Sequence, residues 1–389
     1  MVSVQDAFSI LQNNLPALQQ VEFPLIQAQK HVLASAVFSP INMPPFRQSA
    51  MDGYALCLFE GLEYEIIGEI KAGDSHLVEL LPGQAIKIFT GAAVPDSAQA
   101  VIQIEKVSEK DGRLFLQEPV KPETNVRPVG EQISVGELAL EKGTLLNAAA
   151  IGFLAGLGFT SAKVFQKPNV GIVVTGNELT KPGEPLEYGK VYESNGIMLA
   201  TALKEAYFEK VTLYEVNDDF ENTKNKLAEA LSENEVVLVS GGISVGDYDF
   251  VARALKELEV ETLFYKVNQK PGKPLFAGKT KDKIIFALPG NPAAALTCFY
   301  VYVVPTLFIL SGKAPNYSQS RLISIAHDYS VRNTRSQFLK ANIVNDEANV
   351  LSHQASSMLN SFAVSNGLVF VPDGIYELKK GDKVEVYLL

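Results

Sequence analysis

The spacing of apolar residues changes along the chain, and each change predicts a different kind of structure. Near the start, apolar residues recur every three or four positions, which is typical of one helix face; they are Val4, Ala7, Phe8, Leu11 and Leu15. Further helices are predicted over 28–37 and 147–157, and a strand over 162–165. Between them, residues 54–140 contain short apolar runs separated by glycine and proline, which predicts an inserted all-β domain. Its strands are predicted at 64–70, 85–89, 100–105 and 113–116.

Residues 169–310 alternate between short β-branched runs and amphipathic stretches, which is typical of a doubly wound α/β sheet. The predicted strands are 170–175, 210–216, 236–240, 261–267 and 284–288, and the predicted helices are 195–207, 220–232, 249–258 and 293–310. After Gly312 only strands are predicted, which indicates a small β-barrel-like domain. These strands are 320–326, 337–344, 350–354, 367–371 and 383–388.

One stretch raises the question of a membrane span. Residues 291–310 contain no charged side chain and approach the roughly 18–20 residues that a spanning helix needs. Pro305 interrupts the stretch, which also follows directly after a predicted strand and turn, so we interpret it as a long buried helix bent near Pro305. The N-terminus lacks the basic and apolar regions of a signal peptide. We therefore expect a cytoplasmic protein with no membrane partner.

The amino-acid composition excludes several classes of ligand and metal site. The 389 residues predict roughly two to four domains at about 150 residues each. The net charge of −10, without a cluster of Lys or Arg, argues against nucleic-acid binding but leaves room for a small anion held by a few cations. Cys57 and Cys298 form no CxxC motif, and the four histidines are scattered. A bound metal ion would therefore have to be held by carboxylates, which favours magnesium.

A glycine-rich loop follows the predicted strand 236–240. Its backbone N–H groups can converge on an anion, because glycine permits close approach and positive φ; the loop residues are Ser240, Gly241, Gly242, Ser244 and Gly246, followed by Asp247 and Asp249. A strand, a glycine loop and an acid before a helix can hold a phosphate and a metal ion. The alternative is an ordinary turn in which Asp249 caps the next helix.

Polar residues that follow the other predicted strands are expected at the same edge of the sheet as the glycine-rich loop. The carboxyl ends of neighbouring parallel strands open on one crevice, so residues far apart in sequence should meet there. They include Glu178, Glu193, Asn195, Asp218, Asp219, Asp249, Lys270, Lys273 and Asn291. Outside this domain, Asp52, Thr90, Arg127, Arg335 and Ser356 lie in loops or at strand ends. Each of these side chains taken alone is an ordinary surface or turn residue.

Together these segments resemble the molybdopterin molybdotransferases, the MoeA and gephyrin E-domain family. The matching stretches occur in the family's order over nearly the whole chain: SAMDGYAL (49–56), IFTGAAVP (88–95), VVTGNEL (173–179), SGGISVGDYD (240–249), KPGKP (270–274) and LPGNPAA (288–294). SAMDGYA separates this family from smaller proteins that share only the α/β domain.

The resemblance implies four domains: a split elongated domain I (1–42 and 143–167), an inserted β domain II (43–142), an α/β molybdopterin-binding domain III (168–314) and a β-barrel domain IV (315–389). It implies a homodimer in which domain II of one subunit faces domain III of the other. It also implies the last step of molybdenum cofactor synthesis, in which adenylylated molybdopterin loses AMP and receives molybdenum from molybdate, with Mg²⁺ required. The adenylyltransferase and apo-molybdoenzymes are the partners that this step implies.

The family's site residues carry over to matching positions. Asp52, Glu178, Asp218 and Asp249 would be catalytic, and the last three would hold magnesium. Substrate would contact Thr90, Arg127, Gly241, Gly242, Ser244, Gly246, Lys270, Lys273, Asn291, Arg335 and Ser356, with Asp52, Thr90 and Arg127 supplied by the partner subunit. Arg335 and Ser356 would hold molybdate.

The chain departs from the family pattern at Asn177 and Gln132, where acids are usual, at Arg127-Pro128-Val129, which often carries more arginines, and at Glu193, where Asp is common. These changes would shift affinity or metal preference, including tungstate over molybdate.

Two other functions are compatible with parts of the sequence. The α/β domain alone also occurs in molybdopterin adenylyltransferases, but that function would leave SAMDGYA unexplained. A gephyrin-like scaffold that keeps the site as a relic is the second alternative, against which the intact acids and lysines argue.

Overall fold

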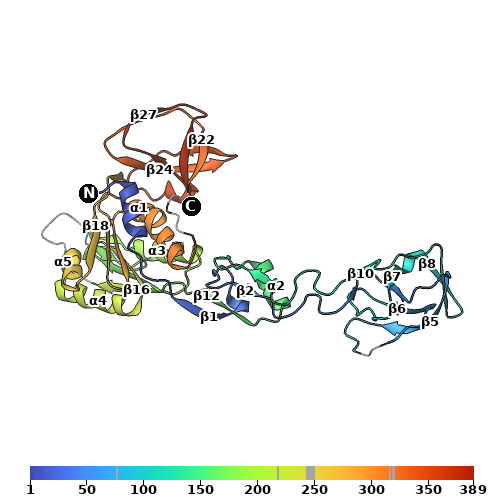
Figure 1. The fold of residues 1–389 in the computed structure, drawn as a ribbon. Helices are drawn as coiled ribbons and strands as arrows, with labels where there is room; N and C mark the ends of the chain where they lie inside the picture. The colour runs from blue at the N-terminus through green and yellow to red at the C-terminus, as the bar shows by residue number, and fades with distance from the viewer. Residues whose placement is uncertain (76–77, 217–218, 242–249, 315–316, 318–319) are drawn as a thin grey trace. The chain divides into compact units, whose positions relative to one another are not determined.

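The computed structural model describes residues 1–75, 78–216, 219–241, 250–314, 317 and 320–389. The chain divides into two compact units (Figure 1). The first unit consists of Met1–Glu22, Lys30–Ala34 and Lys163–Leu389, and the second consists of Phe23–Gln29 and Ser35–Ala162.

A six-stranded sheet forms the centre of the first unit, with the order β16-β13-β17-β21-β20-β18. Its strands are β13 (Val170–Thr175), β16 (Val211–Val216), β17 (Val236–Ser240), β18 (Glu261–Tyr265), β20 (Phe276–Lys279) and β21 (Ile284–Leu288). The first four strands in this order run parallel, whereas β20 is antiparallel to both of its neighbours. Strands β13, β17 and β21 are buried along their whole length, as expected for apolar runs covered on both faces.

Helices cover both faces of this sheet, which confirms the doubly wound α/β prediction (Figure 1). One face packs against α1 (Val4–Gln12), α3 (Asn195–Glu205) and the long helix that follows β21. The other face packs against α4 (Phe220–Glu233) and α5 (Phe250–Glu257). Helix α1 begins in a capping box, in which Ser3 and Asp6 satisfy each other's backbone N–H groups.

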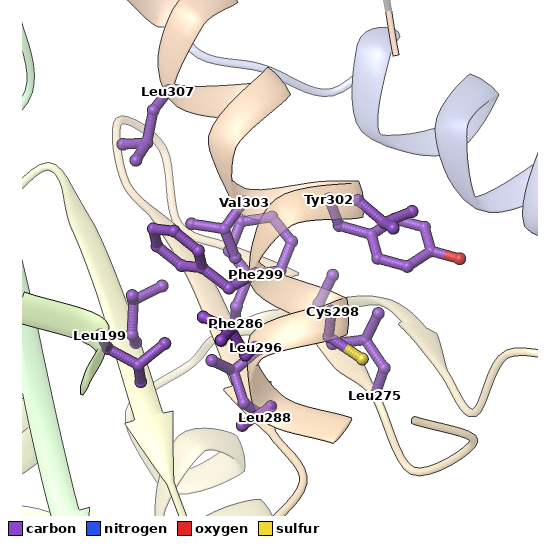
Figure 2. Packing of buried hydrophobic residues seen from close by; sticks show 14 of the residues in the cluster. Leu199, Leu275, Phe286, Leu288, Leu296, Cys298, Phe299, Tyr302, Val303 and Leu307 are labelled. Carbon is purple, nitrogen blue, oxygen red and sulfur yellow. The ribbon is translucent and has the colours of Figure 1, made fainter. Parts of the chain in front are cut away.

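The long helix that follows β21 is a core helix. It comprises α6 (Pro292–Cys298), a π-helical turn (Phe299–Val303) and α7 (Val304–Leu310). Pro292–Leu310 has a mean hydropathy of 2.0 and is the one described helix long and apolar enough to span a membrane, but 83% of it is buried inside the protein. Figure 2 shows Phe299, Tyr302, Val303 and Leu307 packed along it. The irregularity expected near Pro305 appears as the π turn just before it, where the proline lacks an N–H for regular helical bonding.

The last part of the first unit is a closed β-barrel, as predicted. Its strands are β22 (Ser320–Ile325), β24 (Ser336–Val344), β25 (Glu347–Val350), β26 (Gly367–Val371) and β28 (Lys383–Leu388), and pairing of β24 with β26 closes the ring. A short strand from the α/β region, β19 (Gln269–Lys270), adds to β24 in parallel. The antiparallel pair β23 (Tyr329–Asn333) and β27 (Gly374–Leu378) was not predicted. The strand predicted over 350–354 is wrong, because β25 ends at Val350.

The second unit contains the predicted β domain, a six-stranded sheet with the order β7-β4-β6-β5-β9-β8. Its strands are β4 (Gly53–Leu56), β5 (Glu63–Ile70), β6 (Gln84–Ile88), β7 (Ala100–Gln103), β8 (Val107–Lys110) and β9 (Arg113–Leu116). Two small antiparallel pairs accompany it: β3 (Gln48–Ser49) with β10 (Val126–Arg127), and β2 (Val37–Phe38) with β11 (Leu138–Leu140). The predicted helix over 147–157 is α2 (Ala148–Gly156), begun by Asn147, whose side chain accepts from Ala150 N.

The helix predicted over 28–37 is wrong. Leu33 instead bridges Val164 in β12 (Ser161–Phe165), and the backbone N–H of Ala34 donates to the carbonyl of Lys163 at 2.9 Å. Strand β12 also pairs with β1 (Gln20–Pro24). Because the segment finds backbone partners in β12, extended pairing outweighs its modest helix propensity.

Candidate functional site

A cavity of about 270 Å³ in the first unit gathers several of the predicted site residues. It lies where the loops after β19 and β21 meet the barrel. Its lining residues are Gln269, Lys270, Pro271, Gly272, Lys273, Pro274, Pro289, Asn291, Ala294, Arg335, Gln354 and Ser356. Five of these were predicted from the sequence: Lys270, Lys273, Asn291, Arg335 and Ser356. Among the described residues, the lining contains two lysines and an arginine and no acid, although the whole chain has a net charge of −10.

The loop that bears both lysines is fixed from behind by a buried side chain. Gln269 is fully buried, and its amide Nε2 donates to the carbonyls of Pro271 at 3.0 Å and Gly272 at 3.4 Å. Tyr302, in the π turn of the core helix, donates its hydroxyl to Gln269 Oε1. A buried amide with its oxygen and nitrogen both partnered holds its neighbours in one geometry. The core helix therefore fixes the backbone between Lys270 and Lys273.

Gly272 lets this loop pack against the core helix. Its φ is +84°, in the region that favours glycine, and a Cβ there would lie 2.4 Å from Cys298 Sγ. Burial raises the pKa of the Cys298 thiol, which Figure 2 shows among apolar neighbours on the core helix. Cys298 is therefore a packing residue and not a nucleophile.

The barrel contributes Ser356 to the cavity through contacts with the start of α6. The side-chain amide of Asn291 donates to Ser356 Oγ at 2.9 Å, and the backbone N–H of Ala294 donates to the carbonyl of Ser356 at 3.1 Å. These bonds join the LPGNP segment to the loop after β25. The two predicted residues Asn291 and Ser356 are thus in direct contact.

The strand ends beside this cavity are held together by Asn195 and Gly241. Asn195 Nδ2 donates to Ser240 Oγ at 2.9 Å and to the carbonyl of Gly290 at 2.8 Å, so it ties the end of β17 to the LPGNP segment. Gly241 has a φ of +95°, and a Cβ there would lie 2.3 Å from the carbonyl oxygen of Thr175. Only glycine allows this approach between the ends of β17 and β13.

Of the predicted magnesium ligands, the structure describes Glu178, an exposed residue in the turn after β13. Asp218 and Asp249 lie outside the described residues, as do Gly242, Ser244 and Gly246 of the glycine loop. Strand β16 ends at Val216, two positions before Asp218, and α5 begins at Phe250, directly after Asp249. Among the residues described, no group of three or more His, Cys, Asp or Glu side chains could hold a metal ion. Glu193 accepts from the N–H of Gly196 at 2.7 Å at the start of α3.

The second unit holds the remaining predicted residues. Asp52 Oδ1 accepts from both the backbone N–H and the hydroxyl of Thr90, each at 2.7 Å. The backbone N–H and then the hydroxyl of Thr90 lower the pKa of Asp52, which is therefore ionised at neutral pH. Arg127 is exposed on β10, opposite Gln48, whose amide donates to the carbonyl of Gly91 at 3.1 Å. The segment after β6 and strand β10 are thus both connected to Gln48.

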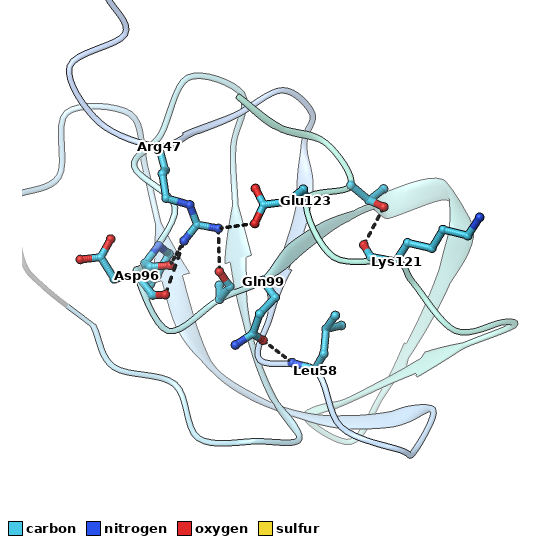
Figure 3. Close-up of polar contacts among 9 residues, drawn as sticks. Arg47, Leu58, Asp96, Gln99, Lys121 and Glu123 are labelled. Carbon is cyan, nitrogen blue, oxygen red and sulfur yellow. Dashed lines mark hydrogen bonds and ion pairs between the residues drawn. The ribbon is translucent and has the colours of Figure 1, made fainter. Parts of the chain in front are cut away.

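Arg47 connects two other loops of the second unit (Figure 3). Arg47 donates to the carbonyls of Pro95 at 3.2 Å and Ala98 at 2.9 Å, and pairs with Glu123 at 3.8 Å. Because its donors are occupied by backbone carbonyls, Arg47 has a structural role.

Three family models match consecutive parts of the chain. They are the MoeA N-terminal region (domain I and II) over residues 2–158, a probable molybdopterin binding domain over 171–308, and the MoeA C-terminal region (domain IV) over 324–389. A molybdopterin molybdenumtransferase from Staphylococcus epidermidis is 30% identical, with 100% of this chain and 95% of that protein covered. One from Haemophilus influenzae is 31% identical, with 99% and 98% covered. The chain belongs to the MoeA family.

Solved structures agree with this assignment. A crystal structure of a molybdopterin biosynthesis MoeA protein from Pyrococcus horikosii is 31% identical and superposes with a TM-score of 0.85, covering 100% of this chain and 99% of that one. The MoeA molybdopterin molybdenumtransferases are transferases, so this chain is a member of an enzyme family.

The sequence analysis did not identify the buried polar residues behind the cavity. Gln269 directly precedes the KPGKP segment, Tyr302 lies in the apolar core helix, and Lys340 lies in a barrel strand. The available signal was a polar side chain inside an apolar run, since such a group is stable only when partnered. The run FLKANIV around Lys340 has this pattern.

Proposed function

We propose that this MoeA protein inserts molybdenum from molybdate into adenylylated molybdopterin, with release of AMP, in a Mg²⁺-dependent reaction in the cytoplasm. The observation that supports this most is the cavity of the first unit, whose described lining residues include Lys270, Lys273 and Arg335 and no acid. A site of this kind in an acidic protein favours small anions. Molybdate is a dianion, and the pyrophosphate of the adenylylated substrate carries two or more negative charges.

The side chains of the cavity differ in which of the two anions, molybdate or the pyrophosphate, they would bind best. Arg335 offers a planar fork of donors, and Ser356 offers a hydroxyl beside the Asn291 amide, which suits a tetrahedral oxyanion. Lys270 and Lys273 are exposed point charges on a loop fixed by Gln269, which suits both molybdate and an adjacent phosphate. Fixed donors stabilise charge that develops as the phosphoanhydride bond breaks and AMP leaves.

A magnesium ion would be held by carboxylates, the ligand type that this hard cation prefers. Glu178 is exposed and forms no ion pair with a Lys or Arg side chain among the described residues, so its carboxylate oxygens could bind a hard cation. We assign Glu178, Asp218 and Asp249 as its ligands, directly or through water. The bound ion would neutralise negative charge on the pyrophosphate.

Asp52, Thr90 and Arg127 would complete the site from a second copy of the chain. These three residues belong to the second unit, and the cavity belongs to the first. We propose a homodimer in which the second unit of one subunit faces the α/β sheet of the other. Asp52 would be an ionised carboxylate at this site, and Arg127 an additional cation for the substrate.

The reaction can be tested by incubating the purified protein with adenylylated molybdopterin, Mg²⁺ and molybdate, and measuring AMP and the molybdenum-loaded cofactor. We expect AMP release that depends on both molybdate and Mg²⁺. A competition assay with molybdate and tungstate present together would show which metal the protein inserts preferentially. Net formation of adenylylated molybdopterin from ATP and molybdopterin, without metal insertion, would instead favour an adenylyltransferase. Absence of both activities would contradict the proposal.

A further inference from the structure

The barrel contains a buried lysine that no acidic side chain neutralises among the described residues. Lys340 lies in the middle of β24 and is only 3% exposed. Its neighbours Leu339 and Ala341 belong to the core inside the barrel, so Lys340 points to the opposite side of the strand. Burial lowers the pKa of its ammonium group. A charge in such a position costs stability unless it is fully hydrogen-bonded.

Three backbone carbonyls satisfy this ammonium group. Lys340 Nζ donates to the carbonyls of His353 and Met358, each at 2.9 Å, and of Ala355 at 3.4 Å. An ammonium group has three N–H donors, and all three are directed at one short loop. The carbonyls of His353 and Met358 also accept from Ser361 Oγ, at 2.9 and 3.2 Å.

The same loop is locked to the backbone of Lys340. The N–H of Lys340 donates to Gln354 Oε1 at 2.9 Å, and Gln354 Nε2 donates back to the carbonyl of Lys340 at 2.9 Å. Gln354 therefore continues the hydrogen bonding of β24 on the side opposite β26, beyond the end of β25. Gln354 also lines the cavity that holds Lys270, Lys273, Arg335 and Ser356, which the proposed function makes an anion cavity.

Ser356 lies between the carbonyls that Lys340 holds. Residues 353, 355 and 358 accept from Lys340, and residue 356 presents its hydroxyl to Asn291 at the cavity. We propose that Lys340 is a positioning residue for anion binding, because it holds the 353–358 loop so that Ser356 and Gln354 face the cavity. This inference rests on the proposed function, since it assumes that the cavity binds the metal oxyanion.

The test compares Lys340→Met with Ser356→Ala and with the double variant. For each, the KM for molybdate, the kcat at saturating molybdate and the unfolding temperature are measured. Loss of a residue that orients a direct ligand typically weakens binding by about tenfold or more. We therefore expect Lys340→Met to raise the KM by about tenfold with a small change in kcat. The double variant should be no worse than the poorer single variant, because both changes remove the same contact.

Two further variants keep the test decisive. Lys383→Met removes an exposed lysine from another strand of the same barrel, and should leave the KM unchanged. If Lys340→Met does not fold, Ser361→Ala removes a weaker hold on two of the same carbonyls, and should raise the KM by about two- to threefold, as loss of one neutral hydrogen bond would.

The outcomes separate the inference from the proposed function. If Ser356→Ala leaves the KM for molybdate unchanged, the assignment of Ser356 to the oxyanion fails. If Ser356→Ala raises the KM while Lys340→Met and Ser361→Ala change only the unfolding temperature, or if the effects on KM multiply in the double variant, Lys340 is a structural residue and the positioning role is wrong.

Discussion

The two charged regions of this protein are built in opposite ways. In the second unit, Asp52 is an exposed carboxylate that accepts hydrogen bonds from Thr90 alone among the described residues. In the first unit, the lysines and Ser356 at the anion cavity are backed by a layer of buried polar groups, among them Gln269, Tyr302 and Lys340. Asp52 is fixed by hydrogen bonds from one nearby loop residue, whereas the residues of the cavity are fixed by contacts with the core helix and the barrel.

The proposed function would explain this difference. A lone carboxylate can act through its charge and tolerates small movements. An oxyanion pocket has to hold several donors at fixed positions, and flexible lysine loops do not stay fixed without support. The buried polar groups supply that support because leaving any of them unpaired is costly. Substitutions behind the cavity should therefore affect binding, while those around Asp52 should affect mainly its charge.

The largest expected effect comes from removing a cation of the cavity. We expect Lys270→Ala to lower molybdate-dependent AMP release by about 10²-fold, the scale for loss of one charge-stabilising group. Lys281→Ala, in the exposed turn before β21, is a matched control that removes the same charge outside the cavity. Equal activity of the two variants would show that the cavity is not the anion site.

A smaller effect is expected from the buried layer. Tyr302→Phe removes the donor to Gln269 Oε1 and should lower the free energy of unfolding by about 1–2 kcal/mol and raise the KM for molybdate. Tyr317→Phe is the control: its hydroxyl is also buried in the core, bonded to Thr306 at 2.7 Å, but does not contact the lysine loop. Denaturant unfolding and KM measurements should show similar losses of stability in both variants but a raised KM only in Tyr302→Phe. A raised KM in both would mean that the buried layer has no specific link to the cavity.

The smallest effect is expected at Asp52. Thr90→Val removes the hydroxyl donor and keeps the backbone N–H, so the pKa of Asp52 should rise part of the way toward its ordinary value. Since the folded-state pKa is below the unfolded value, ionisation of Asp52 contributes stability above the unfolded pKa, and this contribution is lost as pH falls through the folded pKa. Thr90→Val should reduce this contribution of Asp52 ionisation to stability.

Carboxyl NMR titration of Asp52 between pH 2 and 6 checks this prediction. Thr124→Val provides a control in the same unit, because its hydroxyl donates to the carbonyl of Lys121 and not to Asp52. An Asp52 pKa that is unchanged by Thr90→Val would rule out the hydroxyl as a cause.

The sequence was sufficient to predict the architecture, and the reason is local. Continuous β-branched runs such as 170–175 and 236–240 can be buried only inside a covered sheet, and the structure places both at its centre. The antiparallel direction of β20 and the β23–β27 pair depend on partners far away in sequence, which periodicity does not reveal. The same holds for the segment 28–37, where pairing with β12 outweighed helix propensity.

The sequence also predicted only some of the residues at the candidate site. Strand-end positions brought Lys270 and Asn291 to one cavity, and the family resemblance added Arg335 and Ser356. A polar residue inside an apolar run could have marked Lys340, but the partners of Gln269 and Lys340 could not be predicted, because they are backbone carbonyls whose positions exist only in the folded chain.

The most direct test of the account is complementation between two inactive variants. Asp52→Ala and Lys270→Ala subunits with different affinity tags are coexpressed, and the mixed dimer is purified. If Asp52 of one subunit acts at the cavity of the other, the mixed dimer has one intact site and should regain about half of the wild-type AMP release. Activity no higher than that of the two parent variants, in a mixed dimer of confirmed composition, would contradict a site shared between two copies of the chain.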